Sequence, residues 1–293
     1  MKKCFLGLIV TIVTVSMLFS FVGCSKETPA ECFDYEIEGN HIIITGLVKT
    51  DLEKIVIPER IEGSFVTEIE SEAFEDCTSL KNVTIPDSVT EIAYGAFDGC
   101  TSLKNVTIPD SVKEIDDYVF EGCTSLENVT IPESVTEIGT SAFSGCTSLK
   151  NVTIPESVTE IGPRAFSDCT SLTNVTIPDS VKEIDSYAFE GCTSLKNITI
   201  PDSVKEIDYR AFAGCTSLEN ITIPDSVESI SDEAFKDCTG LVEVIIPDSV
   251  KEIYSCAFKG CTSLKNITIP DSVEYIDPTA FEGTGVKLPE RFN

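Results

Sequence analysis

A block of 23 residues recurs almost letter for letter along this chain of 293 residues. One copy begins at Cys77 and reads C-T-S-L-K-N-V-T-I-P-D-S-V-T-E-I-x-x-x-A-F-x-G. Its cysteine returns at the same step in nine copies, at Cys77, Cys100, Cys123, Cys146, Cys169, Cys192, Cys215, Cys238 and Cys261. A strict period of this length is typical of chains in which each repeat is one supersecondary unit that only its neighbours can cover. We therefore predict one elongated solenoid domain built from stacked coils.

The first half of each block has the pattern of a short strand. Leu80, Val83 and Ile85 follow the L-x-x-L-x-L spacing of leucine-rich repeats. Alternation along a strand places Val83 and Ile85 inward and Thr84 outward. Pro86 has no N–H to donate, so it is suited to the end of the strand.

The second half returns the chain along the other side of the coil. Asp87-Ser88 forms a turn, and Val89 and Ile92 point inward again from the opposite wall. Ala96 and Phe97 fill the edge of the core, and we expect them on a tight helical turn. The predicted fold is a leucine-rich repeat solenoid, mainly β, with short 3-10 or helical turns.

Both ends of the repeat array are irregular. Residues 33–44 alternate about a Gly-Asn turn, which predicts a capping β-hairpin at the N-terminal end. Arg60 to Ser64 is a five-residue insertion in the first coil. The last strand element, Val286 to Pro289, follows a coil shortened by four residues. We count ten coils, Pro58–Phe74 through Pro270–Phe281.

The N-terminus has the pattern of an export signal. Lys2 and Lys3 precede the apolar stretch Cys4 to Val22, and Gly23-Cys24 follows. This resembles the lipobox of a bacterial lipoprotein signal peptide, which implies that Cys24 is lipidated and begins the mature chain. An ordinary secretory signal or a single membrane anchor are the alternatives. The expected domains are a signal peptide at 1–23, a tether at 24–32 and a repeat domain at 33–293.

The repeat itself resembles a known family. C-T-S-L-K-N-V-T-I-P-D-S-V-T-E-I-x-x-x-A-F is similar to the BspA-type bacterial surface leucine-rich repeat. Y-E-I-E-G-N-H-I-I-I-T-G and R-I-E-G-S-F-V-T-E-I resemble the N-terminal end of that family. The resemblance implies cell-surface proteins, often adhesins that bind host or bacterial proteins. Ser88 holds the usual Asn/Cys position, so we expect no conventional asparagine ladder.

The charge of the chain limits its partners. Lys plus Arg is 21 against 49 Asp plus Glu, which gives a formal net charge of −28. Nucleic acid is a poor partner, because phosphate neutralisation needs clustered basic side chains. A basic protein surface or a divalent cation is easier to accept. Solubility and self-repulsion are the simpler explanation, and we favour it.

The nine repeated cysteines occupy one position of successive coils. Their Cβ atoms should therefore run parallel at about 4.8 Å, whereas a disulfide needs converging Cβ atoms at about 3.8 Å. We predict a buried ladder of free thiols. A line of thiols also does not provide the converging ligands of a zinc site. Cys32 and Cys256 lie outside the ladder and are the two expected at the surface.

Three further ladders are polar. The outward strand positions carry asparagines from Asn82 to Asn266, interrupted by Glu243, and threonines from Thr84 to Thr268, interrupted by Ile245. This face is suited to an extended partner, but we favour hydrogen bonds between the stacked side chains. An acidic ladder begins at Asp87. Shared Ca²⁺ is a minority hypothesis for it, and a turn cap is favoured. Its members are Asp87, Asp110, Glu133, Glu156, Asp179, Asp202, Asp225, Asp248 and Asp271.

The three residues before Ala-Phe vary from coil to coil, and we name them the variable window. Tyr and Arg are favoured anchors in protein interfaces. The candidate ligand-binding residues are Tyr94, Tyr118, Arg164, Tyr187, Tyr209, Arg210 and Tyr254. Sequence drift on a solvated loop explains the variation equally well.

No constellation of catalytic residues is recognisable. His41 is the one histidine, and it lies in the expected cap. The sequence has no glycine-rich phosphate loop, H-E-x-x-H or G-x-S-x-G motif. We predict a non-catalytic protein without a cofactor, lipid-anchored at the bacterial cell surface, that binds an extracellular or host protein. A structural spacer without a specific ligand is the alternative, and an envelope hydrolase is a distant third.

Overall fold

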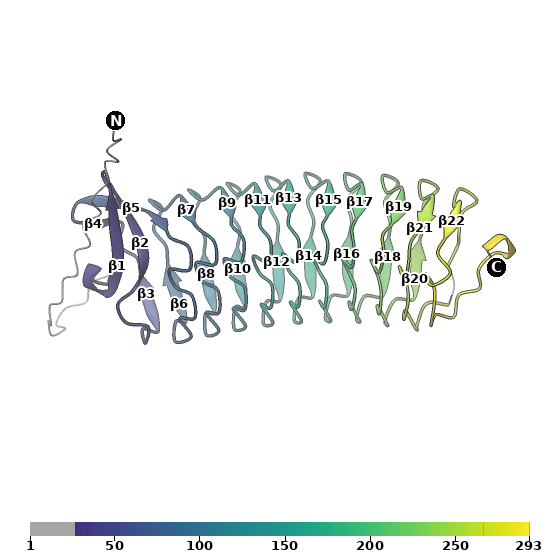
Figure 1. Cartoon of the computed structure of the whole chain (residues 1–293), viewed down its shortest axis with the longest axis horizontal. Helices are drawn as coiled ribbons and strands as arrows, with labels where there is room; N and C mark the ends of the chain where they lie inside the picture. Colours follow the sequence, from purple (N-terminus) through teal and green to yellow (C-terminus); the bar gives the residue numbers. More distant parts are fainter. Residues whose placement is uncertain (1–26, 266, 293) are drawn as a thin grey trace, which may run out of the picture.

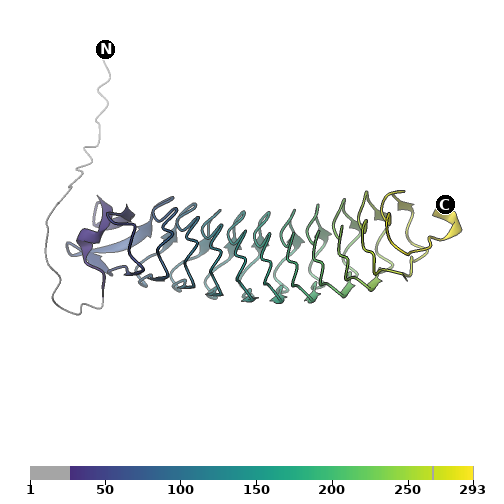
Figure 2. The ribbon, with the colours of Figure 1, turned by 90° about the horizontal axis from the view of Figure 1, so that it is seen from below.

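Each repeat forms one coil that contributes a short strand to each of two walls, as the computed structural model shows for residues 27–265 and 267–292. The coils stack along one long axis (Figure 1). The view turned by 90° shows a nearly straight stack that runs from the hairpin of the first described residues to the last coil (Figure 2). The predicted leucine-rich repeat solenoid is confirmed.

The first wall is a nine-stranded parallel sheet. Equivalent residues pair across it, for example Asn128 with Asn105 and Thr130 with Thr107. From β6 onward the central residue of each strand is buried and its two neighbours are exposed, which confirms the predicted alternation. The strands are β3 (Lys54–Val56), β6 (Asn82–Thr84), β8 (Asn105–Thr107), β10 (Asn128–Thr130), β12 (Asn151–Thr153), β14 (Asn174–Thr176), β16 (Asn197–Thr199), β18 (Asn220–Thr222) and β20 (Glu243–Ile245).

The second wall consists of two-residue strands that also pair in parallel between coils. Each places an isoleucine in the core and, in most coils, a glutamate outside. The strands are β7 (Glu91–Ile92), β9 (Glu114–Ile115), β11 (Glu137–Ile138), β13 (Glu160–Ile161), β15 (Glu183–Ile184), β17 (Glu206–Ile207), β19 (Ser229–Ile230), β21 (Glu252–Ile253) and β22 (Tyr275–Ile276).

The Ala-Phe segment forms the expected tight turns, which do not continue into a regular helix. The N–H of Phe97 donates to Val119 O of the next coil at 2.9 Å, whereas Cys100 N–H donates back to Phe97 O within its own coil. Along the segment, successive backbone N–H groups donate alternately to a carbonyl of the next coil and to a carbonyl of their own coil. A continuous helix would keep every donor within the segment. In the described part of the chain, 3-10 helices occur only at Ala30–Cys32 and Glu290–Phe292, outside the coils.

The core is a column of stacked phenylalanine rings with aliphatic side chains on both sides. Neighbouring rings from Phe74 to Phe281 lie 5.0–5.6 Å apart between centroids, with interplanar angles of at most 15°. Leu80, Val89 and Ile92 are buried with them, as are their equivalents in the other complete coils. Each coil therefore completes the core of the next.

The N-terminal end is closed by a hairpin. β1 (Phe33–Glu38) pairs antiparallel with β2 (His41–Leu47), as predicted. The inserted residues of the first coil form a second hairpin, β4 (Arg60–Ile61) with β5 (Ser64–Ile69). β5 pairs with β2 on one side and with β7 on the other, so the insertion joins the cap to the second wall.

The described part of the expected tether is attached to the first coil. Thr28 N–H donates to Val56 O at 2.8 Å, and Val56 N–H donates to Thr28 Oγ1 at 2.8 Å. Cys24 and the expected signal peptide lie outside the described residues. Within residues 27–265 and 267–292, no helix has the length and apolar character needed to span a membrane.

The nine ladder cysteines are free and buried, as predicted. From Cys100 onward each thiol donates to the carbonyl of the phenylalanine 26 residues earlier, as from Cys169 Sγ to Phe143 O at 3.2 Å. Burial raises the pKa of Cys169 and of Cys215 to about 12. The thiols therefore satisfy backbone carbonyls and do not pair with one another.

We expect iodoacetamide to modify at most Cys32 and Cys256 in the native protein, because alkylation requires an accessible thiolate. Both of these thiols are half-buried, whereas the ladder is closed to solvent. Denaturation should expose nine further sites, which a second isotopic form of the reagent would count by mass spectrometry. Disulfides between ladder cysteines in non-reducing spectra would contradict the prediction.

Candidate ligand-binding ridge

The third residue of the variable window adopts the left-handed backbone conformation in nine coils. These residues form a row along the solenoid, which we name the ridge. Its members are Glu72, Gly95, Tyr118, Ser141, Arg164, Tyr187, Arg210, Glu233 and Cys256, with φ between 54° and 63°.

A second left-handed row lies four residues further along each coil, and its composition differs. Glycine occupies seven of its ten positions and aspartate three, at Asp76, Gly99, Gly122, Gly145, Asp168, Gly191, Gly214, Asp237, Gly260 and Gly283. Glycine adopts positive φ without steric cost, and aspartate tolerates it. The second row therefore follows the local preference of the backbone.

The ridge does not follow this preference. Only one of its nine residues is glycine, although each other side chain costs roughly 1–2 kcal/mol in this conformation. Tyr118, Arg164, Tyr187 and Arg210 are ridge residues, and all four were candidates from the sequence alone. Backbone strain of this kind is a reason to look for a functional role of the side chains.

The structure brings four of the candidates into one cluster. The Arg164 guanidinium lies 4.3 Å from the centroid of the Tyr187 ring, and that of Arg210 lies 5.7 Å from it. Tyr209 meets Tyr187 edge to face at 5.1 Å. Arg164 is exposed and the other three are half-buried outside the hydrophobic core. The result is a continuous aromatic and cationic surface.

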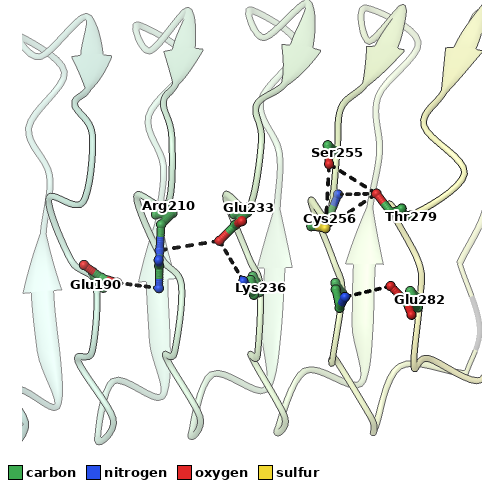
Figure 3. A network of polar contacts seen from close by, with 9 residues as sticks. Glu190, Arg210, Glu233, Lys236, Ser255, Cys256, Thr279 and Glu282 are labelled. Carbon is green, nitrogen blue, oxygen red and sulfur yellow. Dashed lines mark hydrogen bonds and ion pairs between the residues drawn. The ribbon is translucent and has the colours of Figure 1, made fainter.

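Acidic side chains hold Arg210 in place (Figure 3). Its Nη2 lies 2.7 Å from Glu190 Oε1, and its Nε lies 3.7 Å from Glu233 Oε2, an ion pair without a hydrogen bond. Lys236 Nζ also contacts Glu233 at 2.9 Å. Burial alone would lower the pKa of Arg210, but the two glutamates outweigh it and raise the pKa. Arg210 is therefore a fixed part of the surface.

The remaining tyrosine candidates form two separate pairs. Tyr94 and Tyr118 lie 5.1 Å apart between ring centroids. Tyr254 lies 6.5 Å from Tyr275 and donates its hydroxyl to Glu252. Tyr275 was not a candidate. It stands where most coils have the outward glutamate of the second wall, and this replacement was visible in the sequence.

The outer face of the first wall carries the asparagine and threonine ladders. Hydrogen bonds between stacked asparagines contribute little to holding its coils together. In the described part of the chain, one hydrogen bond between two asparagine side chains connects neighbouring coils, from Asn174 Nδ2 to Asn151 Oδ1 at 3.2 Å. Asn266 lies outside the described residues. The serine that replaces the usual asparagine instead donates to the preceding coil. These donors are Ser88, Ser111, Ser134, Ser180, Ser203, Ser226 and Ser272.

The second wall carries a row of glutamates that the sequence reading missed. It runs through Glu68, Glu91, Glu114, Glu137, Glu160, Glu183 and Glu206, and returns at Glu252. Like charges directly opposite one another destabilise a sheet. Burial and then the neighbouring glutamates raise the pKa of Glu68 and of Glu137. The Glu-Ile pair that recurs before the variable window was the sequence signal for this row.

The acidic ladder that begins at Asp87 does not make the contact that a turn cap requires. Within the described residues, no carboxylate of this ladder accepts a hydrogen bond from the backbone two residues later, so the predicted turn cap is wrong.

Three carboxylates converge at another place, at the end of β15 and β17. Oxygens of Glu183, Asp185 and Asp208 lie within 4.8 Å of one another. Asp208 already accepts hydrogen bonds from Ser186 Oγ and Tyr209 N–H.

An open groove of about 580 Å³ lies at the C-terminal end of the first wall. It is lined by Ile245, Lys265, Ile267 and Val286 among others, where the asparagine and threonine ladders are interrupted. Ile245 is 54% exposed. No candidate residue from the variable window lines this groove, so it is separate from the ridge.

Comparison with known proteins agrees with this architecture. The BspA type leucine rich repeat region matches residues 47–173 and 159–287 in six copies. A leucine-rich repeat protein from Bacteroides ovatus is 34% identical, with a TM-score of 0.81, over 92% of this chain and 70% of its own. The leucine rich repeat protein of T. pallidum is 40% identical, with a TM-score of 0.63, over 66% of this chain and 91% of its own. No curated protein matches. The chain belongs to the BspA-type leucine-rich repeat family.

Proposed function

We propose that this protein is a non-catalytic, surface-exposed binding protein whose ridge recognises an extracellular protein. The observation that carries the proposal is the occupation of strained left-handed positions by Tyr and Arg, beside a second row that uses Gly and Asp. Tyr and Arg are enriched among the residues that dominate protein interfaces. The surface exposure of the family supports an extracellular partner.

The Arg164–Tyr187–Tyr209–Arg210 cluster is the expected centre of recognition. Its contacts limit the rotamers of long side chains before a ligand arrives. A surface that is already ordered loses less conformational entropy on binding. The cluster therefore combines large contact area with preorganisation.

We expect the double variant Tyr187→Ala/Tyr209→Ala to bind its ligand at least ~10-fold more weakly, which corresponds to about 1.4 kcal/mol. The loss of stability should stay near 1–2 kcal/mol, because an aromatic pair and an exposed cation–π contact are each worth about 1 kcal/mol. Pull-down of extracellular-matrix and bacterial surface proteins would identify the ligand, and titration calorimetry would measure affinity.

A matched control lies on the strand face. Thr153→Ala/Thr176→Ala removes two exposed side chains from neighbouring strands and leaves the ridge unchanged. If this control weakens binding and the tyrosine variant does not, recognition belongs to the asparagine and threonine face. If no protein binds saturably, the chain is a structural spacer.

We propose further that Cys24 carries a lipid that anchors the protein at the bacterial envelope, as the sequence around Gly23-Cys24 suggests. Cys24→Ala, expressed in a bacterium that processes lipoproteins, should lose metabolic labelling with a fatty acid and appear in the soluble fraction. Labelling and membrane association that persist in this variant would contradict lipidation at Cys24.

A further inference from the structure

The ridge carries two cations, Arg164 and Arg210, and the protein itself neutralises only the second. The guanidinium of Arg210 lies 2.7 Å from Glu190 Oε1 and 3.7 Å from Glu233 Oε2 (Figure 3). Within residues 27–265 and 267–292, Arg164 takes part in no ion pair, and its guanidinium donates no hydrogen bond to the protein. The N–H groups of Arg164 are therefore free to bind a ligand.

The positions that neutralise Arg210 hold different residues around Arg164. They lie 20 residues before the arginine and 23 residues after it. Around Arg164 these positions are occupied by Ser144 and Tyr187, neither of which is a carboxylate. The guanidinium of Arg164 instead lies over the Tyr187 ring, 4.3 Å from its centroid. The repeat therefore keeps the cation at this place without either of its carboxylates.

The coil that precedes Arg164 is uncharged on the side of the ridge. Residues 138–149 include no Asp, Glu, Lys or Arg, whereas the equivalent stretch of every other coil includes at least one. This stretch is bonded to the coil of Arg164, with Ser141 N–H donating to Pro163 O at 2.9 Å. A carboxylate that reaches Arg164 from this side therefore meets serine hydroxyls and no like charge.

Two deeply buried serines flank Arg164. Ser141 is 2% exposed and Ser167 is 1% exposed, and no other polar or charged residue of the described chain is buried to this degree. The Oγ of Ser167 has no hydrogen-bond partner, which is uncommon for a buried hydroxyl because its desolvation is costly. Ser167 N–H donates to Arg164 O at 3.0 Å. An unpartnered hydroxyl and an unpaired guanidinium therefore belong to one turn.

The nearest carboxylates do not neutralise Arg164. Burial raises the pKa of Glu121 and of Glu190, and the charge of Arg164 reduces both shifts, at Glu190 together with that of Arg210. Neither carboxylate lies within ion-pair distance of Arg164, and Glu190 is already paired with Arg210. The field of Arg164 therefore reaches these groups without a direct contact.

A guanidinium that packs on a ring still offers its edge to a carboxylate. Its N–H groups lie in the plane of the group, and Tyr187 lies against one face of that plane. A carboxylate accepts two parallel hydrogen bonds from such an edge. Because the ring limits the rotamers of Arg164 beforehand, less conformational entropy is lost when the carboxylate binds.

We propose that Arg164 binds the carboxylate of an Asp or Glu side chain of the protein partner. This carboxylate does for Arg164 what Glu190 does for Arg210. At the other ridge positions a carboxylate meets no free cation, so the contact fixes the position of the partner along the ridge more than it adds affinity. The inference rests on the proposed function, because it names the partner's chemistry at the central cluster.

The test uses the peptide acetyl-Lys-Ser-Tyr-Glu-Tyr-Ser-Lys-amide and the same peptide with glutamine for glutamate. Titration calorimetry at about 0.15 M salt, where exposed charges are screened beyond ~8 Å, measures both against the purified protein. We expect the glutamate peptide to bind about 3- to 5-fold more tightly, as for a good exposed ion pair. The net charge of −28 favours the glutamine peptide, which carries one positive charge more, so long-range attraction cannot produce this preference.

Nuclear magnetic resonance locates the contact. The chain has four arginines, Arg60, Arg164, Arg210 and Arg291, so ¹⁵N-labelled arginine gives a simple Nε–H spectrum. The resonance that is absent from Arg164→Gln belongs to Arg164. It should shift when the glutamate peptide is added and shift much less with the glutamine peptide. Arg164→Gln should also lose the preference between the two peptides.

A second variant supplies the missing carboxylate from the protein itself. Ser144→Glu places glutamate at the position that Glu190 holds for Arg210, and should remove most of the preference. Glu121 shows that this position accepts glutamate. Lys259→Gln is the matched control, because it changes the net charge by the same amount at the same position of a distant coil. It should leave the preference unchanged.

Equal or tighter binding of the glutamine peptide would overturn the proposal, and so would a glutamate peptide that does not bind. A preference that survives in both Arg164→Gln and Ser144→Glu would place the carboxylate elsewhere and also overturn it. Failure here leaves the proposed function intact if a natural ligand still depends on Tyr187 and Tyr209. If that dependence fails and the peptides behave as expected, the tyrosine pair loses its recognition role and the carboxylate site remains.

Discussion

Replacing Phe166 with alanine is expected to lower the free energy of unfolding by about 3–5 kcal/mol. Phe166 is fully buried near the middle of the ring column, 5.3 Å from Phe143 and 5.6 Å from Phe189. Its removal leaves a cavity shared by three coils. Because each coil is covered only by its neighbours, the loss should extend to the adjoining coils.

Hydrogen exchange measured by mass spectrometry is the suitable readout, because long repeat arrays need not unfold in one step. Protection should fall most in the coils of Phe143, Phe166 and Phe189. Phe65→Ala is the control, since this ring is 38% exposed and lies in the cap beneath Arg60. A loss of less than about 1 kcal/mol at Phe166 would contradict a continuous ring column.

Acidification from pH 7 to about pH 5 is expected to raise the melting temperature. The pKa values of Glu68, Glu137 and Glu183 are raised in the folded protein above the ordinary 4.5, by burial first and neighbouring carboxylates second. The folded state thus binds protons more readily than the unfolded state in this range. Stability then increases as the pH falls and is lost as the pH rises. Hydrogen bonds from Thr279 lower the pKa of Asp277 below its ordinary value of 3.8. This carboxylate therefore reduces the stability only at a lower pH than the range of the experiment.

Glu137→Gln/Glu160→Gln removes two adjacent charges from the glutamate row without changing its shape. At pH 7 this variant should be more stable than the wild type by roughly 0.2–1 kcal/mol for each like-charge contact removed. The difference should shrink as the pH falls toward the raised pKa of Glu137, because protonation of this carboxylate removes the repulsion in the wild type. A wild-type melting temperature that decreases steadily from pH 7 to pH 5 would show that repulsion in this row does not govern stability.

The sequence predicted the parts of the fold that depend on burial. Val83, Phe97 and Cys100 repeat at one period, and identical spacing in a stack forces identical environments. The hydrogen bonds that join the turn at Ala96-Phe97 to its neighbour could not be predicted, because spacing does not reveal where an N–H donates. The Phe97 donor finds Val119 O of the next coil, and only the stacked structure brings that carbonyl within reach.

The candidate ridge was predictable as a set of residues but not as a surface. Tyr and Arg in the variable window indicated interface residues, whereas nothing in their spacing indicated a left-handed backbone. The contact of Arg210 with Glu190 joins residues of neighbouring coils and depends on side-chain direction.

The direction of the hydrogen bonds between coils determines how the protein responds to mechanical force. The parallel strands of both walls bond along the stacking axis, as between β10 and β12. Tension applied between the two chain ends therefore loads these bonds one coil after another, as in a zipper, and not all at once in shear. Each coil that peels away releases 23 residues, about 80 Å of extended chain. A protein held at one end and bound along its ridge would lengthen stepwise under flow. The coils that are still stacked would remain bound to the ligand.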